Sequence, residues 1–441
     1  MKTSYLILLY LFFLVACSGN EEIVKIPTVE NKYDPTLPLS ADRIKPAYGS
    51  IDNVFVVEGN FKGDISDMKV YFGNKPAVLV ATDGRSIMGI VPKQPPGNNS
   101  ISVVTGRDSL APANLKFKYR QTQTLKTVAG VLDQEGSEDG DLNAARFTEA
   151  SHIATVKGQK GDNIIVSEAW WIARLRLISL DDNKVITLAT SISSFGTPAV
   201  DKSREKFYAI GIFDTGHDIY SFSRANGWLP VMTGIKIAQK DANTWIHGLQ
   251  FFGEDEQYLY ALSTQCQFFR INLKDKSYQQ ITLHGTLPTV FGWRSALIYS
   301  KYHDCFFASF SDEHGIYKIY NTGGSLNPGI NSWQMEKYAG FNGPGGKTGH
   351  RLNDAQFHIP YGLTVTSAGE IFVINRNGHF INKISGDRVE LVAGKLGVVG
   401  ATNDDPLEAL FNQPQDIAVD SDDNLYIAGG GDRTVRKLSI E

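Results

Sequence analysis

The chain has 441 residues, of which 42% are hydrophobic and 20% are charged, a balance typical of a folded protein rather than a disordered one. The length exceeds what one hydrophobic core usually holds, so we expect two or more domains. The formal net charge of −4 argues against the basic surface that nucleic-acid binding requires, and we expect no nucleic-acid partner. The 42 glycines, 24 phenylalanines and 18 tyrosines favour an all-β protein of short strands.

The first 17 residues predict an export signal rather than part of the fold. Lys2 gives a positive start, and the apolar run 6–15 is too short to span a bilayer comfortably. The run ends in LVAC at 14–17, which resembles the lipobox of bacterial lipoproteins. The resemblance implies cleavage before Cys17, acylation of its thiol and, because Ser18 follows, sorting to the outer membrane, with Glu21-Glu22 suggesting the cell exterior. An ordinary signal peptide or a short membrane anchor is the alternative.

Residues 18–36 are polar and contain two prolines, which predicts a tether. Residues 37–120 then carry short apolar runs separated by turns rich in glycine, asparagine and proline. We expect strands at 54–57, 69–72, 77–80, 86–91, 100–104 and 115–119. Six short strands in such a segment indicate a β-sandwich.

The details of residues 37–120 resemble the IPT/TIG family. The resemblance is carried by Ile44-Lys45-Pro46, Glu58-Gly59-Asn60-Phe61, Val70-Tyr71-Phe72-Gly73, Val91-Pro92 and Gly97-Asn98-Asn99. It implies an immunoglobulin-like sandwich. Since such domains bind ligands in some proteins and act as spacers in others, the fold leaves function open. We expect a spacer that holds the next domain away from the membrane.

Residues 121–441 contain a repeated skeleton, an Ala-Gly pair followed by Ala-x-Phe. The glycine and the phenylalanine are 17 residues apart in each copy: Gly130 and Phe147, Gly340 and Phe357, Gly394 and Phe411. A spacing kept three times indicates one supersecondary unit in several equivalent places. We predict that Ala-Gly marks the exit from an outer strand and that Ala-x-Phe anchors the loop returning to an axis.

The rest of this segment divides into six units of about 45–55 residues, with first strands expected near 153, 199, 248, 297, 363 and 417. The runs 360–363 (PYGL) and 414–419 (PQDIAV) resemble NHL repeats, which implies a six-bladed β-propeller. The chain ends after three strands of the last unit, and residues 124–128 match the missing fourth. We predict that this N-terminal strand closes the ring. An open solenoid is the alternative, but it would need a capping unit.

No motif of nucleophilic catalysis or phosphate binding is present, so the axis of the ring is the expected functional place. Polar and aromatic residues stand where the first strands begin: His152, Trp245, His247, Trp293, Arg294, His358, Tyr361 and, beside Gln415, Asp416. The aromatic candidates also include Trp170, Trp171 and Trp228, and each tryptophan has blade packing as its alternative role. We expect no catalytic residues.

We expect no cofactor, and binding of zinc or calcium is the alternative. Some propellers resembling this one hold zinc through histidine, and His152, His247 and His358 are of the type that zinc binds, but they do not occupy one repeat position. The acidic runs 135–141 and 403–405 offer oxygens to calcium without an ordered ligand spacing. Cys266 and Cys305 could pair or remain buried free thiols.

The sequence favours an outer-membrane lipoprotein that recognises an extracellular ligand without catalysis. Tryptophan and tyrosine faces beside polar edges suit sugar rings, so a glycan or an envelope protein is the expected partner. A metal-dependent hydrolase or lyase with an axial site is one alternative. A scaffold that assembles other envelope proteins is another.

Overall fold

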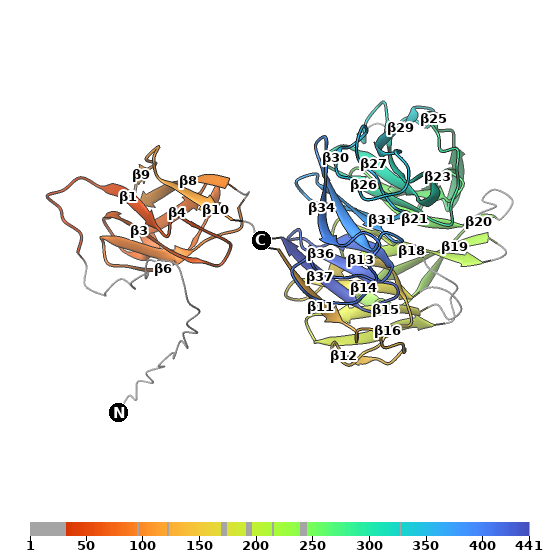
Figure 1. Cartoon of the computed structure of the whole chain (residues 1–441), viewed down its shortest axis with the longest axis horizontal. Helices are drawn as coiled ribbons and strands as arrows, with labels where there is room; N and C mark the ends of the chain where they lie inside the picture. Colours follow the sequence, from red (N-terminus) through yellow and green to blue (C-terminus); the bar gives the residue numbers. More distant parts are fainter. Residues whose placement is uncertain are drawn as a thin grey trace. The chain divides into compact units, whose positions relative to one another are not determined.

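The computed structural model describes residues 32–94, 97–120, 123–168, 174–190, 196–213, 216–238, 245–326 and 328–440. The chain divides into two compact units, one before Gln123 and one from Gln123 to Ile440 (Figure 1). Within these ranges the only helices are the 3₁₀ turns η1 (Ile65–Asp67), η2 (Arg224–Asn226) and η3 (Ser311–Glu313), and none could cross a membrane. Cys17, like the predicted signal peptide around it, lies outside the described residues.

The N-terminal unit is a sandwich of two sheets, as the sequence predicts. One sheet has the order β1 (Ser40–Lys45), β3 (Val54–Asn60), β7 (Ser86–Ile90), β6 (Val78–Thr82). The other has the order β2 (Tyr48–Gly49), β10 (Lys116–Tyr119), β8 (Gly97–Thr105), β4 (Met68–Phe72), β5 (Lys75–Pro76), and β9 (Asp108–Leu110) pairs with β8. Between the sheets, the rings of Phe55 and Phe117 each contact Phe72 edge-on, at centroid distances of 5.0 and 5.2 Å.

The described part of residues 123–440 forms six blades, which confirms the predicted propeller (Figure 1). Blade 1 contains β13 (Ala150–Lys157), β14 (Asp162–Glu168), β15 (Arg174–Ser179), β16 (Lys184–Thr190) and the edge strand β12 (Gly140–Asp141). Blade 2 contains β17 (Ala199–Val200), β18 (Lys206–Phe213), β19 (Gly216–Ser223) and β20 (Val231–Ala238). Blade 3 contains β21 (Ile246–Phe252), β22 (Asp255–Ser263), β23 (Phe268–Asn272) and β24 (Ser277–Ile281).

The other three blades repeat this meander. Blade 4 contains β26 (Ser295–Ser300), β27 (Cys305–Phe310), β28 (Gly315–Asn321), β29 (Trp333–Gly340) and the edge strand β25 (His284–Gly285). Blade 5 contains β31 (Pro360–Val365), β32 (Ile371–Asn375), β33 (Phe380–Ser385), β34 (Arg388–Gly394) and the edge strand β30 (Gly349–His350). Blade 6 contains β35 (Pro414–Val419), β36 (Leu425–Gly429), β37 (Val435–Ile440) and β11 (Gln123–Ala129).

The ring closes where the start of the propeller meets its end. Strand β11 pairs antiparallel with β37, with Thr124 opposite Ser439 and Leu125 opposite Leu438. The inner strands also contact one another around the whole ring, in the order β13, β17, β21, β26, β31, β35 and back to β13. The predicted closing strand is therefore confirmed. Because no blade edge at the junction is left open, the ring needs no cap.

The 17-residue spacing has a direct structural cause. Gly394, at the end of outer strand β34, has φ = 86°, and a Cβ there would lie 3.0 Å from the ring of Phe411. Gly130 and Gly340 meet the rings of Phe147 and Phe357 in the same way. All three rings are fully buried. Only glycine tolerates both the left-handed backbone and the close approach of the ring, so each pair locks the loop that leads to the next inner strand.

Cys266 and Cys305 do not form a disulfide bond. Cys305 is buried and Cys266 is half-buried, and both are free thiols in separate core clusters. Burial raises the pKa of each thiol to about 12. Both are therefore protonated and unreactive at neutral pH, as expected of thiols that serve packing.

Candidate functional site

Residues near the starts of all six inner strands meet at one end of the propeller axis, which we call the axial mouth. The residues that meet there are His152 (blade 1), Thr197 (blade 2), His247 (blade 3), Arg294 (blade 4), Tyr361 (blade 5) and Asp416 (blade 6). Small residues in the same strands allow this convergence: a Cβ at Gly362 would lie 2.2 Å from a carboxylate oxygen of Asp416.

Arg294 is the centre of this cluster. Its buried side chain crosses from blade 4 to blade 1, where Nη2 donates to the carbonyl of Ser151 at 2.9 Å and to Nδ1 of His152 at 2.7 Å. Nη1 donates to Oε1 of Gln415 in blade 6 at 3.1 Å. The guanidinium carbon also lies 5.1 Å from the ring centroid of Tyr361 in blade 5. One side chain therefore links four blades.

Asp416 supplies the negative charge that faces this guanidinium. It is buried, and its Oδ2 accepts from the backbone N–H of Ile153 at 3.3 Å and from the hydroxyl of Thr197 at 2.9 Å. The same oxygen lies 3.9 Å from Nη2 of Arg294 and 3.8 Å from Nδ1 of His152. Burial outweighs these favourable contacts and raises the pKa of Asp416 to about 6.

The raised pKa of Asp416 makes stability depend on pH. As the pH rises from 3.8, the carboxyl ionises in the unfolded chain before it ionises in the folded one. The folded state therefore loses stability between that pH and about 6, by about 3 kcal/mol for a shift of this size. Above pH 6 the carboxylate is charged in both states and this contribution is constant.

The histidines of the axial mouth are neutral. Arginine can only donate, so Nδ1 of His152 accepts from Arg294 and the ring proton resides on Nε2. Burial, followed by the charge of Arg294, holds the pKa values of His152 and His247 well below 6.5. Their rings meet edge-on at 5.8 Å between centroids. His217, on β19, is also buried, which lowers its pKa to about 4.

The three histidines of the zinc alternative, His152, His247 and His358, do not form one cluster. His358 contacts His314, at 6.2 Å between ring centroids, and its backbone N–H donates to Asn375. The described ranges contain no group of three histidine, cysteine or carboxylate side chains placed to hold a metal ion. In addition, the cationic Arg294 already uses Nδ1 of His152. The donor set around His152 and His247 therefore does not fit a metal.

Two tryptophans of the axial mouth are open to solvent. Trp245 is 39% exposed and Trp293 is 69% exposed, and their ring centroids are 5.7 Å apart. Trp245 also stacks on His247 at 6.1 Å. By contrast, Trp228 is buried against Phe207 and serves packing. Trp170 and Trp171 lie outside the described residues.

Sequence reasoning did not single out Thr197 and Arg376. Thr197 precedes the two-residue strand β17, and its hydroxyl donates to Asp416 at 2.9 Å and lies 3.0 Å from Nδ1 of His152. Arg376 lies in the turn after β32, where its guanidinium carbon is 5.2 Å from the centroid of Tyr361. No motif marks either residue. Only their place in the repeat, at a strand start and at a turn of the same mouth, could have suggested them.

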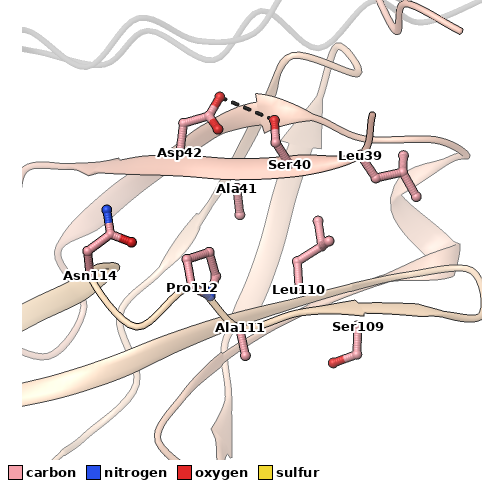
Figure 2. Close-up of a pocket in the computed structure, with 9 residues that line it drawn as sticks. All are labelled: Leu39, Ser40, Ala41, Asp42, Ser109, Leu110, Ala111, Pro112 and Asn114. Carbon is pink, nitrogen blue, oxygen red and sulfur yellow. Dashed lines mark hydrogen bonds between the residues drawn. The ribbon is translucent and has the colours of Figure 1, made fainter. Parts of the chain in front are cut away.

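The N-terminal unit has a hollow of its own, between β1 and the segment that follows β9 (Figure 2). It has a volume of about 560 Å³ and is lined by Leu39, Ser40, Ala41, Asp42, Ser109, Leu110, Ala111, Pro112 and Asn114. Figure 2 shows the lining side chains, with the hydroxyl of Ser40 donating to the carboxylate of Asp42. This hydrogen bond is 3.2 Å long. The lining has no aromatic ring and no buried charge, so the axial mouth is the stronger candidate for a ligand site.

Comparison with known proteins agrees with this architecture. Residues 39–119 match the IPT/TIG domain. No protein of curated function matches the chain. A protein of unknown function from Bacteroides thetaiotaomicron is similar in structure, with a TM-score of 0.75 and 29% identity, over 93% of this chain and 100% of its own.

Two further solved structures share the fold. Both are described as auxiliary nutrient binding proteins, one from Bacteroides thetaiotaomicron and one from Bacteroides ovatus. Each has a TM-score of 0.60 and 18% identity, over 93% of this chain and 99% of its own.

Proposed function

We propose that this chain is a noncatalytic binding protein of the cell envelope, and that its axial mouth binds an extracellular glycan. One observation carries the proposal: two exposed tryptophans, Trp245 and Trp293, stand beside a buried polar network that joins blades 1, 2, 4 and 6. Sugar rings offer apolar C–H faces to such aromatic surfaces and hydroxyls to polar groups around them.

The state of the polar network favours binding over chemistry. Arg294, Asp416 and His152 are hydrogen-bonded to one another or to neighbouring blades. They therefore hold the mouth in one geometry, as a preorganised binding surface requires. The description of two structural relatives as nutrient binding proteins is compatible with this role, although at 18% identity they share the fold alone. We also propose that the repeats of this propeller are related to NHL repeats.

Substituting the exposed tryptophans tests the binding site. We expect Trp293→Ala and Trp245→Ala each to weaken glycan binding roughly tenfold or more, since a buried aromatic contact contributes about 1–3 kcal/mol. A glycan array would identify ligands, and calorimetric titration of each variant would measure affinity. Tyr302→Ala is the matched control, because Tyr302 is 68% exposed but follows the other end of β26. Equal loss in all three variants would place the ligand elsewhere.

We also propose that the protein is anchored to the outer membrane through lipid on Cys17, with the IPT/TIG domain as a spacer. The support is the lipobox-like LVAC at 14–17. Two or three acyl chains suffice for stable anchoring. Cells fed a palmitate analogue are expected to label the wild-type chain and to leave Cys17→Ala unlabelled. Labelling that persists in the variant would refute lipid attachment at this residue.

A further inference from the structure

One cation of the axial mouth forms no ion pair within the described part of the chain. Arg376 is half-buried, and its hydrogen bonds go to neutral amide oxygens, those of Asn377 at 3.0 Å and of Gln413 at 2.8 Å. Its Nε is buried and has no hydrogen-bond partner. The Nε atoms of Arg176, Arg204 and Arg436 are likewise buried without a partner, so the feature that sets Arg376 apart is the lack of a carboxylate partner.

Other buried arginines of the propeller differ from Arg376 in this respect. Arg176 lies 3.3 Å from Glu168, Arg436 pairs with Asp432, and Arg294 faces Asp416 at 3.9 Å. These three have a carboxylate built into the fold. Arg376 has amides instead, so its charge is available to an anion that comes from outside.

The position of Arg376 is fixed in advance. The ring of Tyr361 lies between two guanidinium groups, with Arg294 at 5.1 Å and Arg376 at 5.2 Å from its centroid. This stacking, together with the bonds to Asn377 and Gln413, limits the rotamers open to Arg376. A planar guanidinium held in this way presents its remaining donors as a fork, which suits an oxyanion.

We propose that the axial mouth prefers an anionic saccharide, carrying a carboxylate or a sulfate, and that Arg376 binds the anionic group. The inference rests on the proposed glycan-binding function and specifies its ligand class. In this arrangement Trp245 and Trp293 contact the sugar rings, while the side-chain amides of Asn377 and Gln413 bond to hydroxyls next to the charge.

Matched pairs of charged and uncharged ligands test the proposal. The purified chain is titrated with tetragalacturonate and its methyl ester, and with a chondroitin sulfate tetrasaccharide and its desulfated form. We expect one charged ligand to bind roughly tenfold or more tightly than its uncharged partner, the gain of a charge-assisted hydrogen bond. In Arg376→Gln this preference disappears while binding of the uncharged form remains. Arg388→Gln, an exposed arginine in the outer strand of the same blade, keeps the preference.

The outcomes separate this inference from the proposed function. Binding without charge preference, or a preference that survives in Arg376→Gln, would overturn the anion site and leave glycan binding intact. If no saccharide binds, the proposed function fails, and thermal unfolding with sodium galacturonate or sulfate then decides the role of Arg376. A rise in the melting temperature of the wild type that Arg376→Gln loses and Arg388→Gln keeps would support the anion site. Equal shifts in all three proteins would refute it.

Discussion

Replacing Arg294 by alanine is expected to lower the free energy of unfolding by about 3–5 kcal/mol, the usual effect of removing one partner from a buried ion pair. The change leaves the carboxyl of Asp416 buried without its guanidinium, and removes the bonds to Ser151, His152 and Gln415. The pKa of Asp416, already raised to about 6, should rise further. The variant should therefore lose stability more steeply than the wild type as the pH rises above 6. Urea unfolding at pH 5 and pH 8 measures both effects.

The double variant Arg294→Ala/Asp416→Asn is the control for this prediction. Asparagine keeps the shape of Asp416 but cannot ionise, so the double variant should recover part of the stability that the single variant loses at pH 8. A loss that is the same at both pH values, and that Asp416→Asn does not relieve, would show that Arg294 acts through packing and not through its charge.

Removing the closing strand is expected to abolish cooperative folding of the propeller. A fragment that begins at Gly130 lacks β11, which leaves the outer edge of β37 unpaired and removes the buried side chain of Leu125. Several ladder hydrogen bonds of about 1 kcal/mol each, together with about 2–5 kcal/mol for the apolar side chain, approach the whole stability of an ordinary domain, about 5–15 kcal/mol.

A fragment that begins at Gln123 keeps β11 and is the matched control. Calorimetry should show one cooperative transition for this fragment and none, or a broad one at much lower temperature, for the shorter one. Equal transitions in the two fragments would show that the ring is stable without its closing strand.

The architecture could be predicted from the sequence because the propeller is built from repeated units. A glycine and a phenylalanine that touch in each copy must keep their spacing, so Gly394 and Phe411 could be recognised beside their equivalents. The closing role of residues 124–128 followed from a unit with one strand too few. The two-residue edge strands β12, β25 and β30 carry no pattern of their own, since so short a run has no periodicity to detect.

The candidate site could be predicted only in part. That His152, Arg294 and Asp416 lie together follows from their similar places near the starts of inner strands. Which partner each one takes does not follow, because the long side chain of Arg294 reaches across the axis to blade 1 as well as contacting the neighbouring blade 5. His358 stands at a similar place in the sequence, yet its ring contacts His314. The solvent exposure of the tryptophans could not be predicted either, because the sequence does not distinguish a tryptophan that packs between blades from one that binds a ligand.

The most direct test of the proposed function is a crystal structure of the chain with a saccharide that an array has identified. The account predicts that the sugar lies at the axial mouth, with a ring against Trp245 or Trp293 and its polar groups toward blades 5 and 6. A sugar found in the hollow beside β1 and β9, or on the outer strands of the propeller, would contradict the account.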